Sequence, residues 1–185
     1  MGEAGLSADA LEGLVPAAVR SLEGLRAKKE SGALPLLSLP WRRDDLEEGA
    51  ALAAELRGWA RRVLVLGLGG SSLGGATICR LAEKGGSFSR DAPKLHFLDN
   101  IDPATFTSIF KRIELEKTAV IAISKSGGTA ETLCQTLICH DAFVAAGLDP
   151  AKHFITVTEP GPRPLRQFAE KIGCRCLDHD PAIGG

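Results

Sequence analysis

Five short apolar runs constrain the fold of this chain more than any other feature of its sequence. They are Val63–Leu66, Leu95–Leu98, Ala119–Ile123, Phe154–Val157 and Cys174–Leu177. Each run is too short for a typical helix, and several are rich in β-branched residues, as strands buried on both faces are. Segments with helical character separate the runs. This repeated alternation of strand and helix predicts an α/β fold with a parallel sheet.

The predicted architecture is a three-layer α/β/α sandwich around a five-stranded parallel sheet with strand order 2-1-3-4-5. In this order the first and third strands are neighbours, and the helices that follow them leave on opposite faces of the sheet. Asp102–Pro103 predicts a helix start, with an N-cap followed by proline at the first helical position. Further helices are expected from Thr129 to Gly147 and over Leu165–Ile172 before Gly173.

The first 60 residues predict a helical N-terminal arm. Ser7 is the predicted N-cap of a first helix with apolar residues at three- and four-residue spacing. The stretch "SGALPLLSLPW" (Ser31–Trp41) holds two prolines and predicts an extended connection. Asp44 and Glu47 then resemble a capping box for a second helix that reaches about Trp59.

Length and composition bound the class of protein. The 185 residues suffice for one ordinary domain with a small extra part, so we expect an arm over residues 1–60 and a single domain over residues 61–185. The formal net charge of −1 gives no overall field for nucleic acid or an anionic membrane. No apolar run approaches the ~20 residues of a membrane span. Five scattered cysteines without a CxxC pair indicate a reducing compartment, which predicts a cytoplasmic protein.

Two glycine- and hydroxyl-rich loops follow the first and third predicted strands. They are "GLGGSSLGG" (Gly67–Gly75) and "SKSGGT" (Ser124–Thr129), and each opens a helix. Glycines let the backbone turn sharply and approach a ligand closely. Free amides at a helix N-terminus, together with the helix dipole, favour an anion such as phosphate. Ser71, Ser72, Ser124, Ser126 and Thr129 add hydroxyl donors.

Because the two loops follow neighbouring strands, we expect them to flank one ligand crevice. A small phosphorylated ligand fits best, with its phosphate at Ser124–Thr129 and its hydroxyls or water at Gly67–Gly75. A dinucleotide is the rival, since Gly67-x-Gly69 follows a strand and Asp99 ends the next one, but the third glycine of that motif is replaced by serine. A Walker loop is excluded because no GK[ST] follows the glycines. An alternative stays open, in which each glycine-rich loop only allows the strand and the following helix to pack closely and binds no ligand.

The stretches "GLGGSSLGG", "SKSGGTAET" and "DHDPAIGG", in this order, resemble the glucose-6-phosphate isomerase family over Arg61–Gly185. Any one stretch alone would indicate only a sugar isomerase (SIS) domain. The resemblance implies that Gly70 and Ser71 contact the substrate. It implies that six residues hold the substrate's phosphate: Ser124, Lys125, Ser126, Gly127, Gly128 and Thr129.

The family interconverts glucose 6-phosphate and fructose 6-phosphate in glycolysis and gluconeogenesis without a metal or organic cofactor. The resemblance therefore implies a sugar phosphate as the small-molecule partner, no nucleic acid or membrane partner, and a homodimer for the full-length enzyme. The family's arginine follows a "GG" such as Gly184–Gly185, and its other catalytic groups lie beyond. We thus expect the chain to be the N-terminal part of a longer enzyme, inactive alone and without catalytic residues. The rivals are a non-catalytic phosphosugar sensor and the isomerase half of a glucosamine-6-phosphate synthase.

The roles of other residues near the expected site stay open at this point. Lys125 could bind phosphate through its ammonium group or through its backbone amide, and His179, after the fifth strand, could touch ligand or be a bystander. Family members often carry bulkier residues at the two glycines of the second loop, from which we expect a looser loop here. Arg163–Lys171 reads as a solvated helix face, and Asp178 and Asp180 read as turn formers.

Overall fold

The computed structural model of the protein describes residues 5–86 and 92–184 and contains two compact units. Within the described residues, one unit comprises residues 5–44 with Ala182–Gly184, and the other comprises residues 45–86 and 92–181. Among the described residues, no helix is both long and apolar enough to cross a membrane.

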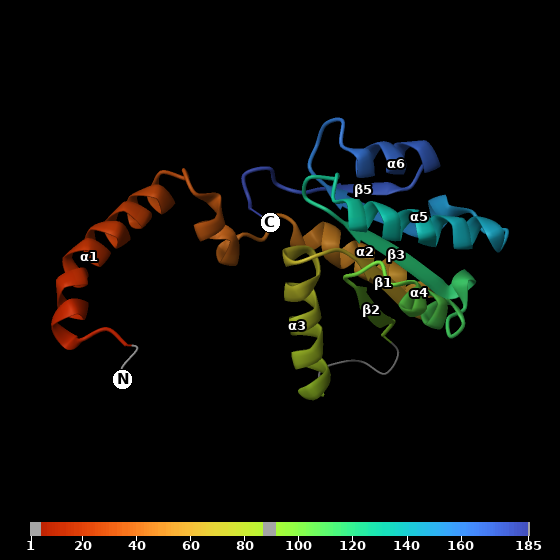
Figure 1. Ribbon diagram of the computed structural model, residues 1–185. Helices are drawn as coiled ribbons and strands as arrows, with labels where there is room; N and C mark the ends of the chain where they lie inside the picture. The colour runs from red at the N-terminus through yellow and green to blue at the C-terminus, as the bar shows by residue number, and fades with distance from the viewer. Residues whose placement is uncertain (1–4, 87–91, 185) are drawn as a thin grey trace. The chain divides into compact units, whose positions relative to one another are not determined.

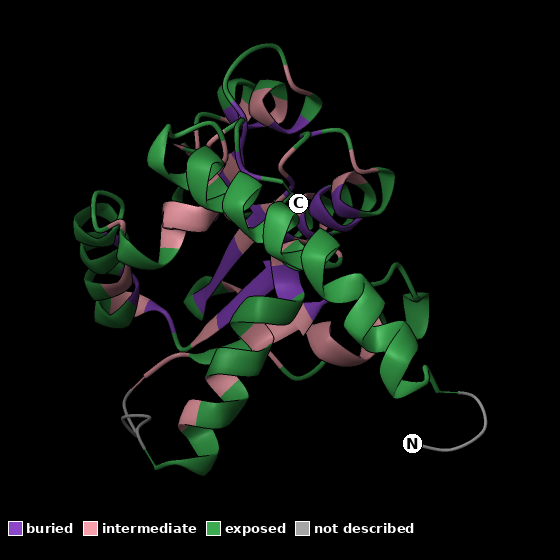
Figure 2. Ribbon diagram, turned by 90° about the vertical axis from the view of Figure 1, so that its left-hand side faces the viewer, coloured by how far each residue is buried: buried purple, intermediate pink, exposed green. Residues whose placement is uncertain are grey.

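The first unit holds the helix α1 (Ala8–Glu30) and the 3₁₀ helix η1 (Pro35–Trp41). The side chain of Ser7 accepts a hydrogen bond from the amide of Ala10 (3.2 Å), which confirms the predicted N-cap. The residues of α1 are exposed along its length (Figure 2). The prediction of an extended connection is wrong where η1 forms. Pro35 occupies the first helical position, where its fixed φ suits the turn and its missing N–H is not needed.

The second unit is built on a parallel sheet of five strands within the described residues (Figure 1). The strands are β1 (Arg62–Leu66), β2 (Lys94–Leu98), β3 (Thr118–Ile123), β4 (Phe154–Thr158) and β5 (Arg175–Asp178). Their order is β2-β1-β3-β4-β5, which confirms the predicted topology. The register sets Leu66 beside Ala122 and Ile123 beside Val157, so the carboxyl ends of the three central strands lie at one edge.

Helices precede the first strand and connect the others, and the sequence signals at Asp102–Pro103 and Gly173 act as expected. They are α2 (Leu46–Trp59), α3 (Gly70–Lys84), α4 (Pro103–Phe110), α5 (Ala130–Ala145) and α6 (Pro164–Ile172), with 3₁₀ turns η2 (Leu115–Lys117) and η3 (Pro150–Lys152). The Asp102 side chain accepts from the amide of Thr105 (2.8 Å), and Pro103 opens α4. Gly173 ends α6 in the left-handed conformation, with φ of 78°.

Both faces of the three central strands, β1, β3 and β4, are largely buried, as their continuous apolar sequences predict (Figure 2). One face packs against α4, α5 and α6, and its buried members include Leu64, Leu66, Val120, Phe106, Phe143 and Leu165. The opposite face packs against α2, and its buried members include Val63, Val65, Ala119, Leu52 and Leu56. Each fully buried leucine or phenylalanine contributes roughly 1.5–3 kcal/mol of transfer free energy. The three-layer sandwich is therefore confirmed.

The start of α2 differs from the predicted capping box. The N-cap position is Asp45, and within the described residues its side chain makes no capping hydrogen bond. Asp44 instead accepts two hydrogen bonds from the guanidinium of Arg42, at 3.1 and 2.7 Å. A planar guanidinium matches a carboxylate with two parallel bonds, and this outcompetes the cap. Since α2 packs on the sheet, the compact unit begins at Asp45; the domain boundary at residue 60 stays a prediction.

Candidate functional site

The two glycine-rich loops leave neighbouring strands at the same edge of the sheet. A Cβ built on Gly67 would lie 3.1 Å from the carbonyl oxygen of Ile123, the last residue of β3. It would also lie 2.9 Å from the Cβ of Ser71, so this backbone approach leaves space only for glycine. The structure thus brings the loop after β1 against the end of β3, where the second loop begins.

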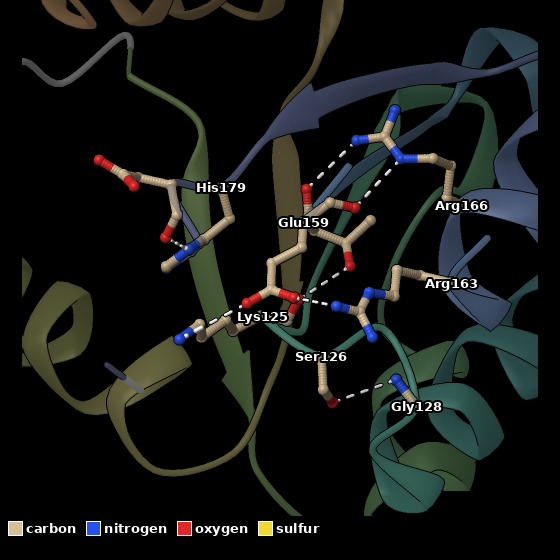
Figure 3. A network of polar contacts seen from close by, with 9 residues as sticks. Lys125, Ser126, Gly128, Glu159, Arg163, Arg166 and His179 are labelled. Atoms are coloured by element: carbon tan, nitrogen blue, oxygen red, sulfur yellow. Dashed lines mark hydrogen bonds and ion pairs between the residues drawn. The ribbon is translucent and has the colours of Figure 1, made fainter. Parts of the chain in front are cut away.

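The loop over residues 124–129 folds on itself and gathers its hydroxyl groups. The Oγ of Ser124 lies 2.9 Å from the Oγ1 of Thr129, and Ser124 is buried. The amide of Gly127 donates to the carbonyl of Ser124 (3.0 Å), and the amide of Gly128 donates to the Oγ of Ser126 (3.2 Å; Figure 3). These short-range bonds make a compact turn between β3 and α5.

Gly127 is the most constrained residue of this turn. Its φ of 65° lies in the left-handed region, and a Cβ there would stand 2.6 Å from the Cβ of Arg163 and 2.7 Å from the Oγ1 of Thr158. Its carbonyl accepts a hydrogen bond from the amide of Leu165 (2.9 Å). The expected looser loop is therefore wrong at Gly127, because β4 and the start of α6 enclose it. Gly128, in contrast, faces open space.

Several backbone amides in and after this turn are available to bind a ligand. Within the described residues, the amides of Lys125, Ser126 and Thr129 and the first three amides of α5 donate no hydrogen bond to the protein. Thr129 is the N-cap of α5, and its side chain bonds Ser124 rather than the helix. Unpaired amides at the positive end of a helix dipole form a favourable position for an anion.

The predicted substrate-contacting residues of the other loop are the first two residues of α3. Gly69, their N-cap, has φ of 53° and ψ of −123°, a combination that only glycine adopts easily. Gly70 is exposed and Ser71 is half-buried, with the amide of Ser71 bonded to the carbonyl of Leu68 (3.1 Å). Ser72 is buried and its hydroxyl points back to the carbonyl of Gly69 (3.5 Å). Gly70 and Ser71 therefore lie at the same edge as the second loop.

A charged cluster beside the second loop was not expected from the sequence. Glu159 directly follows β4, and only 10% of its side chain is exposed. Its carboxylate lies between the ammonium group of Lys125, 3.5 Å away, and the guanidinium of Arg163 (Figure 3). The position of Glu159 was predictable from the sequence. The carboxyl ends of parallel strands lie at one edge of the sheet, and Glu159 directly follows the fourth strand.

Arg166 corrects the expectation of a solvated helix face over Arg163–Lys171. Its guanidinium donates to the carbonyls of Glu159 (3.2 Å) and Thr158 (3.3 Å) and pairs with the Asp178 carboxylate. Asp178 is the last residue of β5 rather than only a turn former. The Arg166 side chain therefore links the carboxyl ends of β4 and β5 through hydrogen bonds and an ion pair.

His179 lies at this edge as well. Its backbone amide donates to the carbonyl of Thr158 (2.9 Å), and its Nδ1 is 2.9 Å from the carbonyl of Asp180 (Figure 3). A carbonyl oxygen can only accept, so Nδ1 is the donor in this contact. Across residues 5–86 and 92–184, His, Cys, Asp and Glu side chains form no group arranged to hold a metal ion.

These features define a class of protein: a doubly wound parallel α/β domain with two glycine-rich loops at its topological switch point. A phosphoglucose isomerase family model matches residues 52–168. The chain therefore belongs to the phosphoglucose isomerase family.

Individual relatives agree with this assignment. A glucose-6-phosphate isomerase of Carboxydothermus hydrogenoformans is 36% identical over 173 residues, which cover 89% of this chain and 37% of that protein. One of Rubrobacter xylanophilus is 32% identical over 99% of this chain and 43% of its own length. The crystal structure of a glucose-6-phosphate isomerase from Chlamydia trachomatis superposes with a TM-score of 0.64 and 31% identity, over 75% of this chain and 26% of that one. The chain thus spans less than half the length of these relatives.

Proposed function

We propose that the whole protein is an aldose–ketose isomerase that interconverts glucose 6-phosphate and fructose 6-phosphate. One observation carries the proposal: the turn over residues 124–129 collects hydroxyls and unpaired amides at the N-terminus of α5, in a chain of this family. Such a turn suits the phosphate group that both sugars share. The activity belongs to glycolysis and gluconeogenesis, and we place it in the cytoplasm as a homodimer.

In this proposal the two loops divide the substrate between them. The phosphate is held by Ser124, Lys125, Ser126, Gly127, Gly128 and Thr129. Gly70 and Ser71 contact the sugar from the neighbouring strand end, which the close approach of Gly67 to β3 supports. Residues 61–185 form the sugar-phosphate-binding domain, with residues 1–60 as its N-terminal arm.

The proposed site binds substrate but does not by itself move protons. A grip on phosphate holds substrate and transition state almost equally, so it strengthens binding without speeding the chemical step. Isomerisation between C1 and C2 also needs a positioned acid–base group, which typically supplies about 10²–10⁴-fold. We propose that other parts of the enzyme supply it, and that these 185 residues alone bind the sugar phosphate without turnover.

Removing the two paired hydroxyls tests the phosphate assignment. The double variant Ser124→Ala with Thr129→Ala should weaken glucose 6-phosphate binding by about 3–6 kcal/mol, because it removes two charge-assisted bonds that contribute ~1.5–3 kcal/mol each. Isothermal titration calorimetry of the 185-residue chain measures this affinity, with glucose as the unphosphorylated comparison.

A matched control removes an exposed hydroxyl elsewhere: Thr107→Ala on α4 should leave the affinity unchanged. Far-UV circular dichroism shows whether both variants stay folded. An affinity for glucose 6-phosphate that is equal in the double variant and the wild type would remove the basis of the proposal.

A further inference from the structure

Glu159 is shared by two cations, and the two contacts are unequal. The ammonium nitrogen of Lys125 stands 3.5 Å from one carboxylate oxygen. The guanidinium of Arg163 binds the other oxygen more closely, with hydrogen-bond geometry (Figure 3). Charge-assisted N–H···O bonds are usually about 2.7–2.9 Å long, so the lysine contact is the weaker of the two.

The position of Glu159 does not depend on the Lys125 side chain. Its amide donates to the carbonyl of Lys125 (3.0 Å), and the Oγ1 of Thr158 donates to the same carbonyl (3.2 Å). Arg166 holds the carbonyl of Glu159 from the other side (3.2 Å). The ammonium group of Lys125 can therefore move while the backbone of the turn and the carboxylate stay in place.

Burial explains why a second cation is needed. The side chain of Glu159 is 10% exposed, that of Lys125 is 28% exposed and that of Arg163 is 43% exposed. An almost buried carboxylate that loses its only cation is strongly destabilised. With Arg163 present, Lys125 can leave Glu159 and the carboxylate keeps one partner.

We propose that sugar-phosphate binding exchanges the partners of this cluster: Lys125 passes from Glu159 to the phosphate, and Arg163 stays on Glu159. Arg163 is then a positioning residue that promotes binding through Glu159, without touching the ligand. This inference rests on the proposed phosphate site at residues 124–129. Two cations and one carboxylate leave a formal charge of +1, which complements the −1.5 to −2 of a phosphate monoester at neutral pH.

The test is a double-mutant cycle on the 185-residue chain, with glucose 6-phosphate as the probe in calorimetry and glucose as the blank. Arg163→Met should weaken binding about fivefold or more, because Lys125 is then needed on Glu159. Glu159→Gln should strengthen binding about threefold or more, because it releases Lys125. In the Glu159→Gln background, the effect of Arg163→Met should be at least about threefold smaller than in the wild type.

Two further variants separate this role from general structure. Arg163→Lys keeps a cation beside Glu159 and should bind like the wild type. Lys171→Met removes an exposed charge from the last turn of the same helix and should change the affinity less than about twofold. Urea unfolding of each ligand-free variant separates changes in stability from changes in affinity.

Three results would overturn the inference. If Arg163→Met weakens glucose 6-phosphate binding equally in the wild-type and Glu159→Gln backgrounds, Arg163 contacts the ligand directly. If Glu159→Gln binds glucose 6-phosphate more weakly than the wild type, the carboxylate itself takes part in binding. If Glu159→Gln does not fold, Lys125→Met replaces it in the cycle, and an undiminished effect of Arg163→Met there has the same meaning. A wild type that does not distinguish glucose 6-phosphate from glucose refutes the proposed function itself, and this inference with it.

Discussion

Replacing Gly127 by alanine tests how the turn is held against β4 and α6. The methyl group would stand 2.6 Å from the Cβ of Arg163 and 2.7 Å from the Oγ1 of Thr158. Both atoms are close to the backbone, so neither can swing away as the end of a long side chain could. The backbone itself must move, and the bond from the Leu165 amide to the Gly127 carbonyl moves with it.

Two costs add to give the expected loss of stability. A non-glycine residue in the left-handed region costs about 1–2 kcal/mol. Forcing a methyl group into a closely packed site typically costs about 1–3 kcal/mol more. The φ of 65° and the two contacts thus predict a loss of about 2–5 kcal/mol in the free energy of unfolding for Gly127→Ala.

Urea denaturation followed by circular dichroism measures this loss, and the next residue supplies the control. A methyl group on Gly128 would meet no atom within 4 Å, so Gly128→Ala should change stability by less than about 1 kcal/mol. If Gly127→Ala and Gly128→Ala have equal stabilities, the turn is not clamped as described and the reasoning is refuted.

Three other predictions concern polar groups that are wholly or partly buried. Gln135 is fully buried and its side-chain amide donates to two main-chain carbonyls at and after the end of β2 (3.1 and 2.8 Å), so Gln135→Ala should cost about 2–4 kcal/mol in urea unfolding. Burial lowers the pKa of His96, so its NMR titration midpoint should lie below its usual 6.5, and the stability it contributes above that pH should be lost as the pH falls. Burial raises the pKa of Cys139 to about 12, so iodoacetamide at pH ~8 should modify exposed Cys134 first, and stability should decline as the pH rises from about 9 toward 12. A His96 midpoint above 6.5, or equal alkylation of both thiols in the folded chain, would contradict these assignments.

The sheet was predictable because its signal is local. Runs such as Val63–Leu66 and Ala119–Ile123 are apolar on both faces, and a parallel sheet covered by helices is the fold that buries such strands. The strong caps were predictable for the same reason, since Asp102 needs only the amide three residues later. The position of the two glycine-rich loops then follows from the strand order alone.

The misses at Asp44, Arg166 and Glu159 have a common cause, which is an interaction with a partner outside the local motif. Asp44 fitted a capping box, but a guanidinium two residues away binds its carboxylate first. Arg166 contacts β4 and β5, and these contacts cannot be predicted from the spacing of charged residues along α6. The role of Glu159 likewise depends on Lys125, which lies 34 residues earlier in the chain. The ammonium nitrogen of Lys125 is 3.5 Å from the Glu159 carboxylate.

An NMR titration of the ¹⁵N-labelled chain with glucose 6-phosphate tests the central claim most directly. We expect saturable shifts for the amides of residues 70–72 and 124–129, with no such response to glucose or NAD. Saturable NAD binding at residues 67–74 and Asp99, or glucose 6-phosphate shifts that bypass both loops, would contradict the claim.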